Sequence, residues 1–172
     1  KKKQGSIEDF NLKKDDYFLA IGRLTKQKNF IFLINCFSKL IKDYPDIKLI
    51  ILGTGEEKEK INRFIRINNL DQNIQLLGYQ KNVFKFLKNC KAFLLSSLWE
   101  DPGFVLIEAM VSDCIVLSSN CPNGPKEILE KRNGLLFNNN SEADFLNKFD
   151  QLINLSHSEK NIIKINAKKK VQ

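Results

Sequence analysis

The sequence predicts an α/β protein with a Rossmann-like, doubly wound parallel sheet of about six strands and helices on both faces. Short apolar runs alternate along the chain with segments whose apolar residues recur at helical spacing. The runs at 47–52 and 92–95 are apolar at nearly every position, which is typical of parallel strands covered on both faces. Ligands of such sheets bind beyond the carboxyl ends of the strands, so the loops that follow the strands are the candidates for function.

In the first half of the chain we expect strands at 17–21, 47–52 and 74–77. Asn29 is the expected cap of a helix that Pro45 ends. The apolar stripe of this helix consists of Phe30, Leu33, Ile34, Phe37, Leu40 and Ile41. A charged helix is expected from Gly55 to residue 69, and a short helix over 83–90.

In the second half we expect strands at 92–95, 115–117 and 134–137, and helices at 103–111, 124–130 and 141–155. Residues 1–16 are interpreted as a linker or domain-boundary segment, 17–155 as the folded domain and 156–172 as a basic C-terminal tail. The sequence begins without methionine and ends just after a lysine run. We therefore expect it to be part of a longer chain.

Composition excludes several classes of protein. The 172 residues carry 28 Lys+Arg and 20 Asp+Glu, for a net charge of +8, and a single histidine, His157. One histidine excludes a His-pair metal site and most His-based triads. All but four of the cations are lysine, which argues against nucleic-acid binding because arginine is preferred there. No apolar stretch is long enough to span a membrane.

Four cysteines occur without a C-x-x-C pair. We interpret them as buried thiols of a reducing compartment, which indicates a cytoplasmic protein. Because the positive net charge comes mainly from lysine, we also expect a peripheral contact with the anionic inner face of the membrane.

The loop after the first strand combines Gly22, Arg23 and Lys28 near a helix start. Two cations beside free helix amides suit a bound diphosphate, and glycine permits close approach of the backbone. The alternative is that both cations are simply solvated.

The loop after the second strand contains Gly53 and Gly55, a spacing also found in dinucleotide-binding fingerprints. Lys58 stands where the third glycine belongs, and Glu56 and Glu57 would repel a pyrophosphate. A tight turn before an acidic helix start is the favoured interpretation.

The loop after the fourth strand has two glutamates eight residues apart, Glu100 and Glu108. Helix-start amides of Gly103, Phe104 and Val105 would point toward a bound phosphate. Glu108 would then reach hydroxyls beside that phosphate, and Glu100 would meet a second polyol. The alternative is a capping acid followed by a helix-surface acid.

The loop after the fifth strand contains Pro122, Gly124 and Pro125, with Glu127 in the following helix turn. Two prolines and a glycine make a rigid turn. We expect this turn to form a wall opposite Glu100.

These motifs together resemble family 4 glycosyltransferases, which are retaining enzymes of the two-domain GT-B fold. Their order is G-R-L-x-x-x-K-N, G-x-G, L-G-Y, E-x7-E followed by A-M, N-x-x-x-G-P-x-E-I and N-G-L-L-F. The resemblance covers residues 17–137. It implies that this sequence corresponds to the C-terminal, nucleotide-sugar-binding domain of these enzymes. The most specific part of the resemblance is the E-x7-E motif together with the upstream Arg/Lys pair.

The resemblance implies a role for each matching residue. Arg23 and Lys28 would grip the donor diphosphate, with Gly22 allowing close approach. Glu108 would hold the ribose hydroxyls, and Glu100 would orient the donor sugar near the reacting centre, which makes it the catalytic candidate.

The same resemblance assigns the amides of Gly103, Phe104 and Val105 to sugar and phosphate, and the segment around Tyr79 to the nucleobase. Many members read E-G-F-G where this sequence has Asp101 and Pro102 after the glutamate. That departure leaves the identity of the sugar open.

The implied activity is transfer of a hexosyl or N-acetylhexosaminyl group, with retention, from a nucleotide-sugar such as a UDP-sugar. The acceptor would be a glycan or lipid-linked glycan of surface polysaccharide synthesis, bound by an N-terminal domain outside this sequence. No metal or other cofactor is expected, because cationic groups and helix amides neutralise the leaving diphosphate. The isolated domain is expected to bind donor without useful transfer.

Three alternatives remain open at this point. A nucleotide-sugar epimerase of GT-B architecture would need histidines that the sequence does not show. A non-catalytic dinucleotide-binding module would rest on Gly53 and Gly55. A basic surface module would rest on Lys81, Lys85 and Lys88, whose spacing places them on one helical face.

Overall fold

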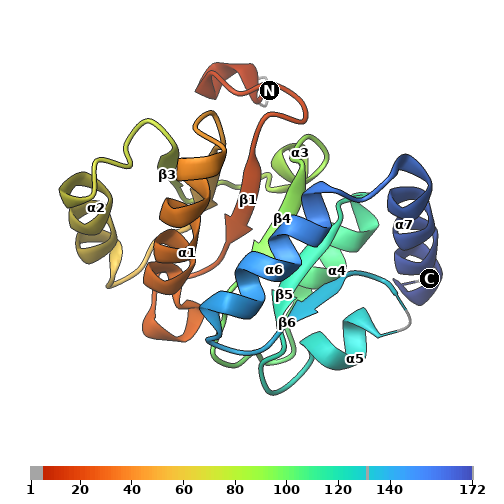
Figure 1. The fold of residues 1–172 in the computed structure, drawn as a ribbon. Coiled ribbons are helices and arrows are strands. Elements are labelled where there is room, and N and C mark those ends of the chain that lie inside the picture. The colour runs from red at the N-terminus through yellow and green to blue at the C-terminus, as the bar shows by residue number, and fades with distance from the viewer. Residues whose placement is uncertain (1–5, 131, 172) are drawn as a thin grey trace.

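The computed structural model describes residues 6–130 and 132–171, which form a parallel sheet with helices on both faces (Figure 1). The strands are β1 (Phe18–Ile21), β2 (Leu49–Leu52), β3 (Ile74–Gly78), β4 (Ala92–Leu95), β5 (Val116–Ser119) and β6 (Leu135–Phe137). All pairings are parallel, in the order β3-β2-β1-β4-β5-β6. This is the doubly wound order, with its switch point between β1 and β4. The predicted fold class is confirmed.

The helices fall into two layers. Those on one face of the sheet are α1 (Phe30–Asp43), α2 (Lys58–Ile67) and α6 (Glu142–Ile153). Those on the other are α3 (Phe84–Leu87), α4 (Phe104–Val111), α5 (Pro125–Leu129) and α7 (His157–Val171). Two short 3-10 helices, η1 (Glu8–Phe10) and η2 (Lys26–Lys28), lie in the segments before β1 and α1.

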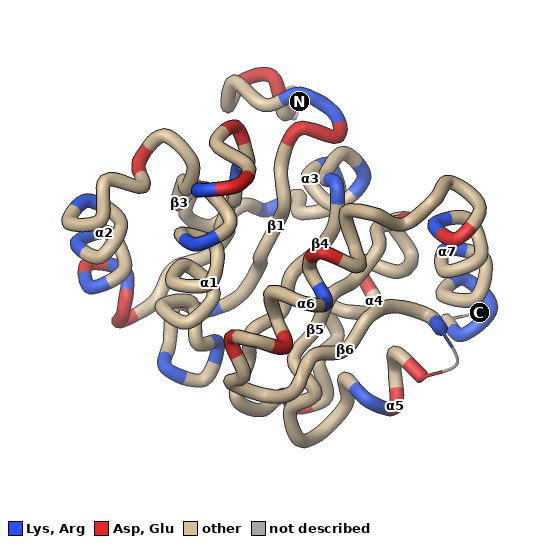
Figure 2. The backbone as a smooth tube through the Cα atoms, viewed as in Figure 1, with Lys and Arg blue, Asp and Glu red and all other residues tan. Residues whose placement is uncertain are grey.

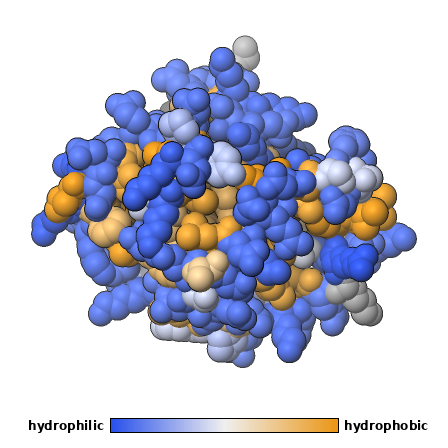
Figure 3. All heavy atoms as spheres, in the orientation of Figure 1, coloured by the Kyte–Doolittle hydropathy of each residue, from blue (hydrophilic) through white to orange (hydrophobic). Residues whose placement is uncertain are grey.

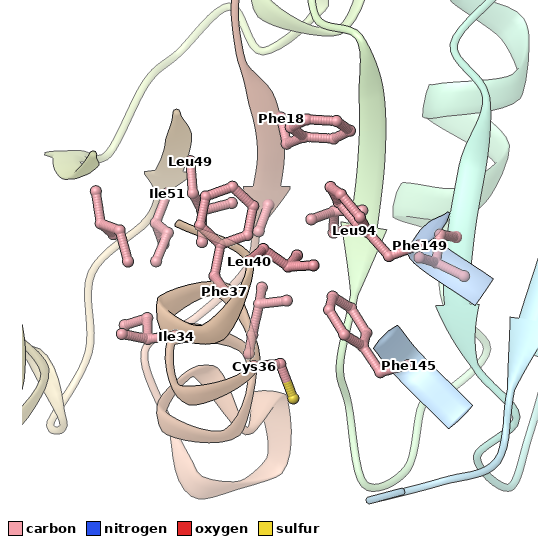
Figure 4. Close-up of a cluster of buried hydrophobic side chains, with 14 of the residues drawn as sticks. Phe18, Ile34, Cys36, Phe37, Leu40, Leu49, Ile51, Leu94, Phe145 and Phe149 are labelled. Carbon is pink, nitrogen blue, oxygen red and sulfur yellow. The ribbon is translucent and has the colours of Figure 1, made fainter. Parts of the chain in front are cut away.

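The sheet separates two hydrophobic clusters because successive strand residues face opposite sides. Phe18 and Ala20 of β1 lie in the cluster under α1, α2 and α6, whereas Leu19 lies in the cluster under α3, α4, α5 and α7. Figure 4 shows side chains of α1 and α6 converging on Phe18 and Leu94. The ring centroids of Phe18 and Phe149 are 4.8 Å apart.

The segment interpreted as a basic tail is instead mostly helical. Helix α7 packs on α4 and buries Ala167, whose small side chain permits close helix contact. Lys168 pairs with Asp113 at 2.8 Å, and Lys170 pairs with Glu130 at 2.9 Å. The lysine run itself remains exposed. The tail interpretation rested on the lysines. In the described part of α7 only Ala167 is fully buried, and Ile163 and Val171 are partly buried.

The described part of the segment before β1 also packs on the domain. Ile7 and Leu12 are buried in the cluster that contains α4. A second difference concerns Asn29, which has a left-handed φ of 54° at the start of α1 and makes no side-chain cap. Its side chain bonds Asn140 instead.

Charged residues are distributed over several elements. Figure 2 shows Lys and Arg on α2 and α7, with Asp and Glu interspersed over the chain. Lys85, one of the three lysines of the basic-face alternative, lies 5.0 Å from the ring centroids of Phe10 and Phe86. In the described part of the chain, no helix is both long enough and apolar enough to cross a membrane.

Candidate functional site

The loops after β1 and β4 meet at the switch point of the sheet. The Leu98 amide donates to the Gln27 carbonyl at 2.8 Å, and the Gln27 side chain donates to the Trp99 carbonyl at 2.9 Å. The Ser96 hydroxyl donates to the Lys28 carbonyl at 2.8 Å. These bonds fasten η2 to the β4–α4 loop, so residues 72 apart in sequence share one site.

The centre of the site is an ion pair between Lys28 and Glu100. The Lys28 ammonium lies 2.6 Å from Oε1 and 2.9 Å from Oε2 of the carboxylate. Only 4% of the Glu100 side chain and 14% of the Lys28 side chain are exposed. The fully buried Ser97 donates its hydroxyl hydrogen bond to the same carboxylate. The alkyl stem of Lys28 lies over Gly22, where a Cβ would come within 3.2 Å of it.

The β5–α5 loop lies directly beside Glu100 rather than opposite it, where the wall was expected. The Glu100 amide donates to the Pro122 carbonyl at 3.0 Å. A Cβ on Gly124 would approach the Pro102 carbonyl oxygen to 2.1 Å, so the two loops are in backbone contact. Burial raises the pKa of the Cys121 thiol in this loop, and the nearby Glu100 carboxylate raises it further.

Helix α4 begins next to Glu100. Gly103 precedes it with a φ of 84°, a left-handed conformation that favours glycine. By helix geometry, the first amides of α4 have no intrahelical acceptor and carry the positive end of the helix dipole. Phe104 is 66% exposed at this end. Glu108 is half-buried in the next turn, and no described residue donates a hydrogen bond to its carboxylate.

Gly53 and Gly55 have a packing role in the structure. A Cβ on Gly53 would lie 1.9 Å from the carbonyl oxygen of Gly22. A Cβ on Gly55 would lie 2.4 Å from the carbonyl oxygen of Leu24. The Leu24 amide also donates to the Thr54 carbonyl at 2.9 Å. The β2–α2 loop thus packs against the Gly22 loop, a contact that the sequence did not predict.

The candidate residues form a connected core with exposed surroundings. Gly22, Lys28, Glu100 and Gly103 are in contact. Arg23 is exposed on the same loop, and Tyr79, which follows β3, is 74% exposed at the same edge of the sheet. Among the described residues, no hydrogen bond or ion pair joins Arg23, Tyr79 or Glu108 to the central pair.

Sequence reasoning gave no role to Ser97, Ser119 and Gln27. The Ser119 hydroxyl donates to the Ser97 carbonyl at 2.7 Å, which fixes the strand end that presents Ser97 to Glu100. Serine residues near the carboxyl ends of two neighbouring apolar strands were the available signal. Gln27 carried no signal, because its role depends on the partner loop.

A cavity of about 990 Å³ lies away from these loops. It is lined by residues such as Phe18, Lys91 and His157, at the amino ends of β1 and β4. Within residues 6–130 and 132–171, no group of three or more His, Cys, Asp or Glu side chains comes together as a metal site.

A doubly wound sheet with a cationic loop, a buried carboxylate and a helix start at its switch point defines a Rossmann-like α/β domain with its candidate site at the carboxyl edge. The chain belongs to the glycosyl transferases group 1 family, whose model matches residues 3–170.

Individual relatives agree with this assignment. An uncharacterised glycosyltransferase of Methanocaldococcus jannaschii is 49% identical over 120 residues, 69% of this chain and 30% of that protein. A Campylobacter jejuni 4-alpha-N-acetylgalactosaminyltransferase acting on a diphospho-undecaprenol glycan is 35% identical over 125 residues, 73% of this chain and 33% of that protein. The chain thus spans about a third of the length of these relatives.

A solved structure is similar over almost the whole chain. A mutant of Staphylococcus aureus TarM, in complex with fondaparinux, alpha-GlcNAc-glycerol and UDP, superposes with a TM-score of 0.85 and 28% identity. The superposition covers 93% of this chain and 32% of that one.

Proposed function

We propose that this chain is the donor-binding domain of a retaining, family 4 glycosyltransferase that uses a nucleotide-sugar, and specifically a UDP-sugar. The observation that carries the proposal is the buried Lys28–Glu100 pair beside the start of α4, at the switch point of the sheet. The similar Staphylococcus aureus TarM structure contains UDP, which supports a uridine nucleotide as the ligand. The proposal places the diphosphate between the Gly22 loop and the first amides of α4.

Each side of the proposed pocket has a distinct task. Arg23 and Lys28 bind the diphosphate, and the helix amides of Gly103, Phe104 and Val105 add hydrogen bonds to it. Glu100 contacts the donor sugar at the reacting centre, and its position is fixed by Ser97. As the bond to the diphosphate breaks, negative charge grows on the leaving oxygen, and these donors stabilise it without a metal ion. Tyr79 borders the base.

Acceptor recognition is proposed to belong to an N-terminal domain, because the relatives are about three times as long as the region they share with this chain. The acceptor is proposed to be a glycan or lipid-linked glycan of a surface polymer, as the names of relatives indicate for those proteins. The chain alone is expected to bind donor without transferring sugar. A peripheral contact of the enzyme with an anionic membrane is part of the same proposal.

The epimerase alternative has less support from the site. His157, the single histidine of the sequence, begins α7 and lines the cavity at the amino edge of the sheet. It is therefore at the edge opposite to Glu100, where it has no contact with the central pair.

Titration of the purified chain with UDP by calorimetry tests the donor assignment. Arg23→Ala should weaken UDP binding by about 10- to 100-fold, because a charge-assisted contact to phosphate is lost. Arg66→Ala is the matched control, since Arg66 is exposed in the last turn of α2, at the opposite edge of the sheet. Equal losses in both variants, or no UDP binding by the folded wild-type chain, would reject the proposal.

The assignment of Glu108 to the ribose makes a separate prediction. Glu108→Gln should weaken UDP binding by about tenfold, because one charge-assisted hydrogen bond to a hydroxyl becomes a neutral one. The variant and the wild type should bind 2′,3′-dideoxy-UDP equally, because that nucleotide lacks the hydroxyls. A loss of the same size with both nucleotides would show that Glu108 acts through the fold rather than through the ribose.

A further inference from the structure

Cys90 and Cys114 face each other in the cluster beneath α4. Their Sγ atoms are 3.2 Å apart, and both residues are buried. Cys90 precedes β4 and Cys114 precedes β5, and these strands are parallel neighbours. Their amino ends therefore lie side by side, which brings together two thiols 24 positions apart in the sequence.

The pair is close to disulfide geometry without a rearrangement of the fold. A disulfide has sulfur atoms about 2.05 Å apart, so the two Sγ atoms need to approach by only about 1 Å. Each thiol donates a weak hydrogen bond of 3.4 Å to a nearby carbonyl, that of Leu87 for Cys90 and that of Ile115 for Cys114. Closing the disulfide would release these two weak bonds.

Cys90 borders the cavity of about 990 Å³ at the amino edge of the sheet, and 7% of the residue is exposed. The cavity is also lined by acids such as Asp15 and by cations such as Lys91 and Lys164. Its floor includes Phe18 and Phe149. Figure 3 shows apolar residues set among hydrophilic ones on the face carrying α1 and α6. A rim of both charges suits a reagent that itself carries carboxylate and ammonium groups.

We propose that Cys90 and Cys114 are a redox-active thiol pair that a small zwitterionic disulfide of the glutathione type oxidises to an intramolecular disulfide. The Cys90 thiolate attacks one sulfur of the reagent, forming a mixed disulfide and releasing one thiolate. The Cys114 thiolate then attacks the Cys90 sulfur and releases the second. Two protein thiols lose their protons and are oxidised, and the reagent is reduced to two thiols.

The crosslink would enclose the segment that carries the candidate site. The loop between the two cysteines contains β4, Glu100, the start of α4 and Glu108. Oxidation would tie both ends of this segment together. The proposal does not depend on the proposed function, because the test below reads the thiols and the stability of the fold directly.

The test is incubation of the native chain with oxidised glutathione, followed by an acid quench, alkylation in denaturant and peptide mass spectrometry. Burial raises the pKa of the Cys90 thiol, so the incubation is run for hours at mildly alkaline pH. We expect a Cys90–Cys114 linked peptide, with Cys36 and Cys121 still alkylated. The oxidised chain should melt about 10 °C higher, because the crosslink restricts the unfolded chain.

Two variants control the experiment. Cys114→Ala should abolish both the linked peptide and the rise in Tm, whereas Cys36→Ala, in the other hydrophobic cluster, should leave both unchanged. Should Cys114→Ala not fold, the peptide map of the wild-type chain still decides. The proposal is overturned if all four cysteines are alkylated, if glutathione remains on Cys90, or if the link forms only in urea.

Discussion

Gly53→Ala should destabilise the domain more than any other single substitution considered for this chain. The new Cβ would lie 1.9 Å from the Gly22 carbonyl oxygen, which is backbone and has no rotamer to change. Gly53 also has a φ of 140°, which side-chain-bearing residues rarely adopt. Steric overlap and strain together should lower the free energy of unfolding by about 3–5 kcal/mol.

Gly78→Ala is the matched control for this prediction. Gly78 also has a positive φ, of 69°, but a Cβ there would meet nothing within 4 Å. Its cost should therefore be the conformational strain alone, about 1–2 kcal/mol. Urea unfolding of both variants measures the difference. Equal destabilisation by the two substitutions would contradict the close approach of the β1 and β2 loops.

Lys28→Met should have the second largest effect. The Glu100 carboxylate would keep its hydrogen bond from Ser97 but lose its cation while remaining buried. Leaving a buried charge without its partner typically costs about 3–5 kcal/mol, and the partial exposure of Lys28 places the expected loss near the lower end, at about 3 kcal/mol. Methionine retains the apolar stem that covers Gly22, so the loss reports on the charge.

Lys39→Met provides the comparison for the ion pair. Lys39 pairs with Glu142 at the surface, where about half of its side chain is exposed. Exposed pairs contribute less than about 1 kcal/mol, so this variant should be nearly as stable as the wild type. Thermal melts of both variants test the prediction. If Lys28→Met melts at the same temperature as Lys39→Met, the central pair does not stabilise the fold.

Much of the fold was predictable because periodicity is a local property. The six strands and the helices α1 to α6 lie within a few residues of their predicted ranges, since each element has a buried face that repeats along the sequence. Helix α7 was missed because its lysines indicated a solvated segment, and in its described part only Ala167 is fully buried. The left-handed conformation of Asn29 was also missed, because it arises where Asn29 ends the short helix η2, which was not predicted.

The site was predictable to a lesser extent. Gly22, Lys28, Glu100 and Gly103 were found as single residues after strands, because the carboxyl edge of a parallel sheet is where such residues function. Their mutual geometry was not predictable, since the 2.6 Å ion pair joins loops that only the sheet order brings together. The thiol pair is a second example. Cys90 and Cys114 have no sequence spacing that predicts a contact.

The sequence by itself therefore determined the class of fold, the positions of most elements and the residue types at the candidate site on the carboxyl edge of the sheet. These follow from patterns within single strands, helices and loops, where one residue constrains its near neighbours. The tertiary structure decided which loops meet, that Lys28 neutralises Glu100, that Gly53 supports Gly22 from behind, and that the last helix packs on α4. Those features depend on the strand order β3-β2-β1-β4-β5-β6, which places β1 beside β4 and joins residues far apart in the chain.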